Sequence, residues 1–105
     1  MERTKTMKLT GTDKKYLLEK IYGGIKQTFE EDLPQIEEAA DVTTYTLYKG
    51  DKSDGRISRT KAIALCGREG WLSGLSRAAF HCTAMREVKG NPNLYVGFDA
   101  HKLFR

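Results

Sequence analysis

Apolar side chains recur at every third or fourth position in the first part of the chain. They stand at positions 17, 18, 21, 22, 25 and 29. This spacing has the period of an α-helix and predicts an amphipathic helix over 13–31. Gly23 and Gly24 fall in its middle, where we expect a kink or a close contact between helices. Asp32 is expected to cap a second, short helix, with Pro34 in its first turn.

A different pattern follows at 42–49, where β-branched and aromatic residues predict a strand. Tyr45 and Tyr48 then lie on opposite faces of that strand, which argues against a single platform of stacked aromatic rings. Residues 50–56 contain two glycines and two aspartates and predict a loop. A second strand is expected over 94–98.

Helical signals fill the segment between these two strands. Ser58 is a good N-cap for a helix that Gly67 would end. A short helical turn is predicted over 68–74, followed by a longer helix over 77–88 with Ser76 as its cap. The sequence therefore predicts three helical pieces in this segment.

The predicted helix over 77–88 has an apolar and a basic side. Its expected buried residues are Phe80, Ala84 and Val88. Arg77 and His81 would face outward, with Arg86 nearby, where they could reach the edges of bases in a nucleic acid. Trp71, in the turn before this helix, is expected to lie in the core.

The order of elements from position 57 onward resembles the winged helix-turn-helix domain of phage excisionases and MerR-type regulators. The residues that carry the resemblance are ISRTKAIALCG at 57–67, SRAAF at 76–80 and LYVGFD at 94–99. In that family one or two residues separate the glycine from the cap of the second helix, whereas here 68–75 intervene and would need a helix of their own. The resemblance implies a DNA-binding domain that combines a helix pair with a β-stranded wing.

These patterns together predict an α+β fold in a single domain, 1–105. It would comprise an N-terminal pair of amphipathic helices, a small antiparallel sheet and a winged helix-turn-helix-like C-terminal half. We expect residues 1–11 to be flexible, 12–41 to form an acidic helical part and 42–105 to form a basic winged-helix-like part.

Charge changes this picture because it is divided between the two parts. The chain carries 18 Lys and Arg against 14 Asp and Glu, a net charge of +4. Residues 12–41 contain four Lys and eight acids, a net charge of −4, whereas 49–105 contain eleven Lys and Arg and five acids, a net charge of +6. Such a basic half predicts an anionic partner, DNA more than RNA, although ordinary solvated charges would give the same composition.

The candidate nucleic-acid-binding residues form two sets. Those expected to contact phosphates are Arg56, Arg59, Lys61, Lys89 and Lys102. Those expected to reach base edges are Arg77 and His81, with Arg86 beside them.

We therefore expect a small nucleic-acid-binding accessory or regulatory protein of the kind that phages and mobile elements encode. The alternative is a protein-binding inhibitor of a host nucleic-acid-directed defence nuclease, comparable to anti-CRISPR proteins, with the acidic helix face at 30–41 placed in a nucleic-acid channel. Either interpretation suits a cytoplasmic protein that does not contact a membrane. No apolar run approaches the roughly 18 residues of a membrane span, and the N-terminus shows no apolar signal-peptide region.

Few residues could support catalysis or hold a metal. Cys66 and Cys82 are the two cysteines, and neither a C-x-x-C nor an H-x-x-x-H spacing accompanies them, so we predict no metal site and no disulfide scaffold. Both are expected to be small buried residues in a reduced compartment. No phosphate-binding loop, HExxH or G-x-S-x-G motif occurs, so we predict no cofactor and no enzymatic activity. The nearest approach to a catalytic set is His81 with His101 and Glu87.

Overall fold

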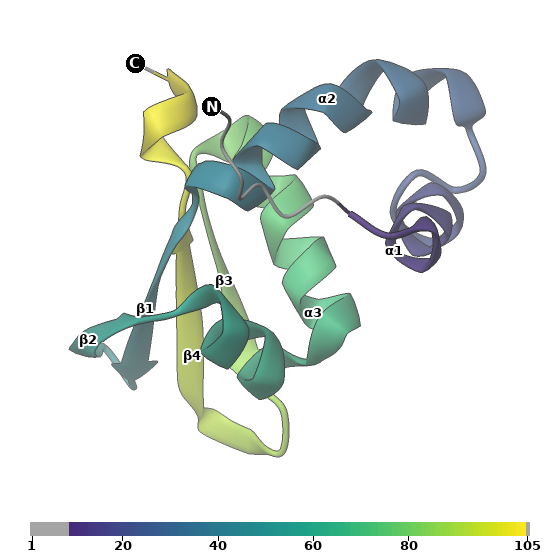
Figure 1. The fold of residues 1–105 in the computed structure, drawn as a ribbon. Coiled ribbons are helices and arrows are strands. Elements are labelled where there is room, and N and C mark those ends of the chain that lie inside the picture. The colour runs from purple at the N-terminus through teal and green to yellow at the C-terminus, as the bar shows by residue number, and fades with distance from the viewer. Residues whose placement is uncertain (1–8, 105) are drawn as a thin grey trace.

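The computed structural model describes residues 9–104, which adopt an α+β fold (Figure 1). The elements in chain order are α1 (Gly11–Tyr16), the π-helical turn η1 (Leu17–Ile21), α2 (Lys26–Val42), β1 (Thr44–Lys49), β2 (Lys52–Ile57), α3 (Arg59–His81), β3 (Thr83–Val88), β4 (Asn91–Asp99) and the 3-10 turn η2 (His101–Phe104). Leu9 is buried and Thr10 caps α1, whereas residues 1–8 of the segment expected to be flexible lie outside the described residues.

The four strands form one antiparallel sheet in the order β2-β1-β4-β3. β1 and β4 are its central strands, with Tyr45 opposite Phe98 and Thr46 opposite Gly97. α3 packs against one face of the sheet, and α1 lies on the side of α3 away from the β1–β2 hairpin (Figure 1). On the other face the ring of Tyr48 lies over Gly97, where a Cβ would come within 2.7 Å of it.

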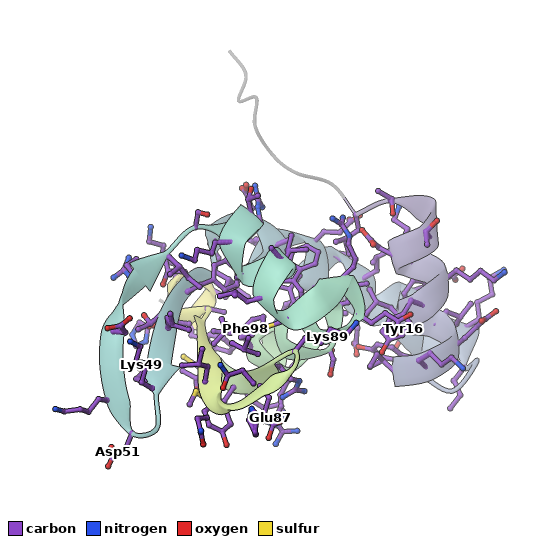
Figure 2. The ribbon with its side chains drawn as sticks, turned by 90° about the horizontal axis from the view of Figure 1, so that it is seen from below. Tyr16, Lys49, Asp51, Glu87, Lys89 and Phe98 are labelled. Carbon is purple, nitrogen blue, oxygen red and sulfur yellow. The ribbon has the colours of Figure 1, made fainter. Side chains whose placement is uncertain are left out.

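The core is centred on Trp71, which is fully buried as predicted. Its indole N–H donates a hydrogen bond to the Tyr45 hydroxyl at 2.9 Å, and the Tyr45 ring meets Phe98 edge to face. Phe98 lies between the sheet and α3 (Figure 2). This ring packs directly against α3 at Gly74, where an added Cβ would be 2.5 Å from it. Close contact between helix and sheet therefore requires a residue without a side chain at this position.

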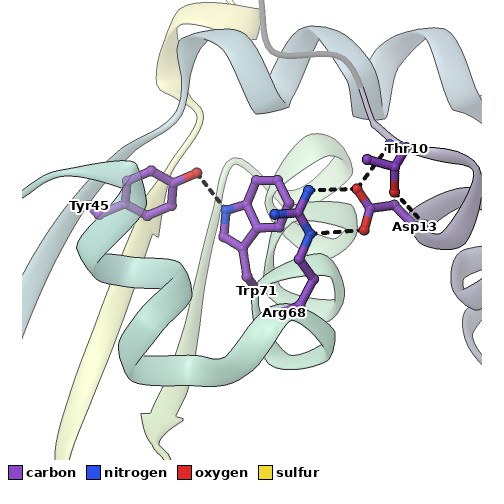
Figure 3. Close-up of polar contacts among 5 residues, drawn as sticks. All are labelled: Thr10, Asp13, Tyr45, Arg68 and Trp71. Carbon is purple, nitrogen blue, oxygen red and sulfur yellow. Dashed lines mark hydrogen bonds and ion pairs between the residues drawn. The ribbon is translucent and has the colours of Figure 1, made fainter.

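An ion pair fastens α1 to α3 (Figure 3). The Asp13 carboxylate accepts hydrogen bonds from Nε and Nη2 of Arg68 at 2.9 Å and 2.8 Å. It also accepts one from the Thr10 N–H at 3.0 Å, which completes a capping box at the start of α1. The bonds from Arg68 and Thr10 hold the pKa of Asp13 below its ordinary value, although burial acts in the opposite direction.

The prediction of one long helix over 13–31 is wrong, because two separate helical segments cover this range. α1 and η1 end before Gly23 and Gly24, whose φ angles of +58° and +82° reverse the chain. Glycine adopts such angles without strain, and two in succession end a helix instead of kinking it. α2 begins after them and contains both Asp32 and Pro34. Asp32 is therefore not a cap, and its carboxylate accepts a hydrogen bond from the Tyr22 hydroxyl at 2.7 Å.

The next helix, α3, starts where the sequence predicts but ends elsewhere. The Ser58 side chain caps it by accepting a hydrogen bond from the Lys61 N–H at 3.1 Å. Gly67, with φ +80° and ψ +156°, breaks it as predicted. Beyond this break the helix runs to His81, so Ser76 lies inside it and is not a cap. The segment expected as a short separate turn is thus the first part of the helix that forms the core.

The helix predicted over 77–88 is wrong in its second half, because Thr83–Val88 form strand β3. Ala84 and Val88 are buried, but as members of a strand. Residues four positions apart share a face in a helix and also in a strand, so this spacing does not distinguish the two. Phe80, expected to be buried beside them, is 38% exposed on α3.

The sheet is larger than the sequence predicts. The strand expected over 42–49 is confirmed as β1 from Thr44 onward, whereas Val42 is the last residue of α2. Most of the predicted loop at 50–56 is strand β2. β2 is an edge strand whose residues 52–56 are all exposed, so no alternation of apolar residues marks it. The strand expected over 94–98 is β4, which already begins at Asn91.

Candidate functional site

Two depressions adjoin each other along α3 and β3, and we call them together the basic groove. The first, of about 240 Å³, is lined by Ile21, Tyr22, Ser73, Ser76, Arg77, Phe80, His81 and Arg86. The second, of about 460 Å³, is lined by Tyr16, Cys66, Gly67, Arg68, Glu69, Gly70, Ser73, Arg86 and Lys89. Ser73 and Arg86 line both, so the two depressions adjoin each other between η1 and the end of β3.

α3 supplies a row of polar side chains along this groove. Ser73, Arg77 and His81 follow one another at intervals of four residues, so they share one face of the helix. Arg77 and His81 are exposed. The sequence does not indicate Ser73, because it predicts a helix that begins after this residue. The helical period of the observed helix, counted from 68 onward, places Ser73 with Arg77.

Arg86 enters the groove from the opposite side, on the edge strand β3. Its Nε and Nη2 donate hydrogen bonds to the Ser73 hydroxyl at 3.2 Å and 2.9 Å, and its Nη1 donates to the Met85 carbonyl at 2.6 Å. These bonds use three of the five N–H groups of the guanidinium. Arg86 is therefore held in place while two donors stay available to a ligand.

Lys89 borders the groove at the end of β3. Its backbone N–H donates to the Leu65 carbonyl at 2.8 Å, and its side chain lies over Gly67, where a Cβ would be 3.4 Å from Lys89 Cδ. Lys89 lies on the side of the molecule that carries Tyr16, away from Asp51 at the tip of the β1–β2 hairpin (Figure 2). The groove and the tip of the β1–β2 hairpin are thus separate surfaces.

The lining of the groove is basic and contains one carboxylate, Glu69. Arg68 is paired with Asp13, which neutralises much of its charge. The N-terminal elements contribute tyrosines and an isoleucine to the groove and no acid. Burial and the hydrogen bond to Asp32 raise the pKa of Tyr22, so its phenol stays protonated.

A second set of cations, which we call the sheet-end cluster, comprises Arg56, Arg59 and Lys102. They border two other depressions of about 260 Å³ each, and Arg56 lines both. Arg59 is partly committed to the fold, because its Nη1 donates to the Ala40 carbonyl near the end of α2. The carboxylates that line these depressions are Asp41 and Asp99. Positive charge is therefore less concentrated here than in the basic groove.

The eight residues expected to bind nucleic acid thus do not form one patch. Arg77, His81, Arg86 and Lys89 line the basic groove, and Arg56, Arg59 and Lys102 form the sheet-end cluster. Lys61 lines neither and is exposed in the first turn of α3. None of the eight forms an ion pair with a carboxylate among residues 9–104. The positive charges of the arginines and lysines among them are therefore not neutralised by an ion pair within this part of the chain.

The two cysteines differ in their surroundings. Cys66 is buried as expected, and burial raises the pKa of its thiol, which keeps it protonated and unreactive. The expectation of burial is wrong for Cys82, which is half-buried because α3 ends there at the surface. Its Sγ lies 3.7 Å from Nδ1 of His101, a residue that the sequence grouped with His81 and Glu87.

Two further findings concern membrane-spanning helices and similarity to known proteins. Among residues 9–104, no helix combines the length and the apolar character that crossing a membrane requires. Comparisons with protein-family models, with curated proteins and with solved structures found no match to this chain.

Proposed function

We propose that this chain is a small nucleic-acid-binding accessory or regulatory protein that holds a sugar–phosphate backbone in its basic groove. The observation that supports the proposal is the lining of that groove. It contains the cations Arg77, Arg86 and Lys89 and one carboxylate, that of Glu69. Cations gathered in this way attract phosphates and release the counterions condensed on them, which supplies most of the affinity of sequence-independent binding.

Arg86 is the cation best suited to a phosphate. Its guanidinium is held by the Ser73 hydroxyl and the Met85 carbonyl, so little side-chain freedom remains to be lost on binding. A guanidinium with free N–H groups also donates directional hydrogen bonds to phosphate oxygens, which a lysine does less well. Arg77 and Lys89 would then supply longer, adaptable contacts on either side.

The proposal extends to the winged helix-turn-helix architecture that the excisionase resemblance implies. In it, the segments of α3 before and after Gly67 correspond to the helix pair, and the β3–β4 hairpin corresponds to the wing. The basic groove lies where the second segment meets the hairpin, so Arg77 and Arg86 would contact one stretch of duplex DNA. With the resemblance we also propose DNA over RNA as the partner, and a regulator that acts in the cytoplasm for a phage or mobile element.

Binding to a short duplex DNA, followed by fluorescence anisotropy over a series of salt concentrations, tests the proposal. Arg77→Gln combined with Lys89→Gln removes two charges from the groove. Lys15→Gln combined with Lys52→Gln removes two exposed charges elsewhere and is the matched control. Each lost phosphate contact lowers the log–log salt slope by roughly 0.9, so the groove variant should lose about two units of slope while the control keeps the wild-type slope.

Three outcomes would count against this proposal. Failure of the wild-type chain to bind at about 50 mM salt would remove nucleic-acid binding altogether. Equal losses in the two double variants would show that binding follows net charge and not the groove. A loss confined to a third variant, Arg56→Gln with Lys102→Gln, would assign binding to the sheet-end cluster instead.

The alternative function, a protein-binding inhibitor of a host defence nuclease, would use α2. Ile25, at the start of that helix, is 60% exposed and could contact a protein partner. Four of the six acids on α2 already have a partner within the chain, however, namely Glu30, Glu31, Asp32 and Glu37. The acidic face therefore offers fewer free carboxylates than the sequence indicates, and the basic groove supports the stronger proposal.

A further inference from the structure

Three side chains that the proposed function does not use lie together where α3 and β4 end. Cys82 is the C-cap of α3, Asp99 is the last residue of β4 and His101 is the first residue of η2. Cys82 Sγ is 3.7 Å from His101 Nδ1, and the potential ligand atoms of all three residues lie within 4.8 Å of one another. We propose that these three residues form a binding site for a zinc ion.

The fold brings the three residues together through the β3–β4 hairpin. Thr83 pairs with Asp99 across the two strands, so Cys82 comes next to Ala100, whose N–H donates to the Cys82 carbonyl at 2.8 Å. The His101 N–H donates to Asp99 Oδ1 at 2.8 Å. A carboxylate that is held through one oxygen can ligate a metal through the other, so this bond orients Asp99 for coordination.

The backbone of Cys82 supports a functional role for its thiol. Its φ and ψ angles are +74° and −41°. Among residues 9–104 it is the one non-glycine residue with a positive φ. Glycine would adopt these angles with less strain, and strained residues of this kind gather at functional sites. A cysteine at this position is therefore explained by a use for its sulfur.

The donor set suits zinc. Thiolate and imidazole are preferred ligands of Zn²⁺, and a carboxylate commonly completes such sites, whereas Ca²⁺ and Mg²⁺ favour sites made of oxygen alone. Zinc–sulfur and zinc–nitrogen bonds of about 2.3 Å and 2.0 Å in a tetrahedron place the two ligand atoms roughly 3.5 Å apart. The distance of 3.7 Å between Cys82 Sγ and His101 Nδ1 is close to this value.

Three protein ligands leave one position of a tetrahedral zinc ion for water or another ligand. Asp99 and His101 are exposed, and they line a depression of about 260 Å³ together with Arg56 and Lys102. Cys82 does not line this depression, so the depression opens beside the three ligands on the side of Asp99 and His101. The site is thus closer in kind to an open zinc site than to a closed structural one.

Metal binding by the full chain, freed of metal beforehand, tests the site. Calorimetric titration with Zn²⁺ should give one ion per wild-type chain, and Co²⁺ used as a probe should give the charge-transfer absorption of a cobalt–thiolate bond. Cys82→Ser should abolish that absorption. His101→Gln should weaken Zn²⁺ binding by more than the roughly 10- to 100-fold that loss of an outer hydrogen-bond partner of a ligand costs.

His81→Gln is the matched control, because it removes the other histidine, which is adjacent to Cys82 in sequence but is not one of the three ligands. His81→Gln should keep the wild-type affinity for Zn²⁺. Zn²⁺ should raise the melting temperature of the wild-type chain and of this control, but not that of Asp99→Asn, whose side chain has nearly the same size. Circular dichroism of each metal-free variant establishes that it is folded.

Absence of the thiolate absorption from the wild-type chain would overturn the site, as would equal losses of affinity in His81→Gln and His101→Gln. Persistence of the absorption in Cys82→Ser would assign the metal to Cys66 and would also overturn it. No nucleic acid enters these measurements, so the zinc site and the basic groove are tested independently.

Discussion

Asp13 is a buried charge whose surroundings explain why the chain tolerates it. Its side chain is 2% exposed and accepts hydrogen bonds from both Arg68 and Thr10. A buried carboxylate destabilises a protein unless its charge is matched, and here a guanidinium and the N-terminus of α1 match it. The Arg68 side chain is 42% exposed, so water would solvate it if the pair were broken. Loss of Asp13 should therefore cost less than loss of one partner from a fully buried pair.

Replacing Asp13 with Asn should lower the free energy of unfolding by roughly 1–3 kcal/mol near neutral pH, since it removes charge-assisted hydrogen bonds and weakens the capping box. The pKa of Asp13 is lowered in the folded chain. Its contribution is therefore present above the unfolded-chain pKa of about 3.9 and is lost as the pH falls through the lower folded-state pKa.

Urea unfolding of wild-type and Asp13→Asn chains, compared near pH 7 and at increasingly acid pH, measures this contribution. The difference between them should shrink as the carboxylate is protonated. Glu30→Gln is the control, because Glu30 and Lys26 form an exposed pair that should contribute less than about 1 kcal/mol. A difference between wild type and Asp13→Asn that stays constant with pH would assign the effect to packing.

The elements of the fold differ in how well local sequence predicts them. The Ser58 cap, the break at Gly67 and strand β1 follow from side-chain chemistry within a few residues, and all three are confirmed. The sequence predicts helix where β3 forms, because the spacing of Ala84 and Val88 fits the period of a helix and that of a strand. The edge strand β2 carries no apolar alternation at all. The pairing of strands depends on segments that are far apart in the sequence, so a local pattern does not predict it.

The candidate site was predictable to a similar degree. Arg77 and His81 share a helix face by their spacing alone, so this pair could be read from the sequence. Arg86 reaches the same groove because β3 turns back along α3, which the sequence pattern did not show. Cys82 meets Asp99 and its neighbours through the register of the β3–β4 hairpin, so no motif spacing marks the proposed zinc site.

The contact between α3 and the sheet is specific at Gly74. Gly74→Ala should destabilise the chain although alanine favours a helix by about 1 kcal/mol over glycine. A Cβ at this position would be 2.5 Å from the Phe98 ring, so the helix would have to move away from the sheet. Overpacking of this kind costs typically about 1–3 kcal/mol.

Thermal unfolding of Gly74→Ala measures this packing. Gly11→Ala is the control, since nothing lies within 4 Å of a Cβ built at the start of α1, and it should be neutral or slightly stabilising. A melting temperature of Gly74→Ala at or above that of the wild-type chain would show that α3 and Phe98 do not press on each other.

Across the whole molecule, the two oppositely charged halves do not cancel each other at the groove. Five of the eight acids in residues 12–41 have a partner within the chain, namely Asp13, Glu30, Glu31, Asp32 and Glu37. That half contributes phenol rings and apolar atoms to the groove lining. The side chains that line the groove therefore carry a positive net charge, although residues 12–41 carry a negative one. Surfaces of opposite sign thus remain on one small domain.

Because of this division, capture experiments can decide between the two proposed functions. Immobilised wild-type chain should retain nucleic acid, and proteins attached to it, from a lysate, and nuclease digestion should release both. Arg77→Gln with Lys89→Gln should retain far less before digestion, whereas Glu31→Gln with Glu38→Gln, which changes two exposed acids on α2, should behave as the wild-type chain does. A nuclease that stays bound after digestion, and that is lost with the α2 variant but kept with the groove variant, would contradict nucleic-acid binding through the groove. It would transfer the function to the acidic surface, because charge complementarity then acts on a protein partner and not on phosphates.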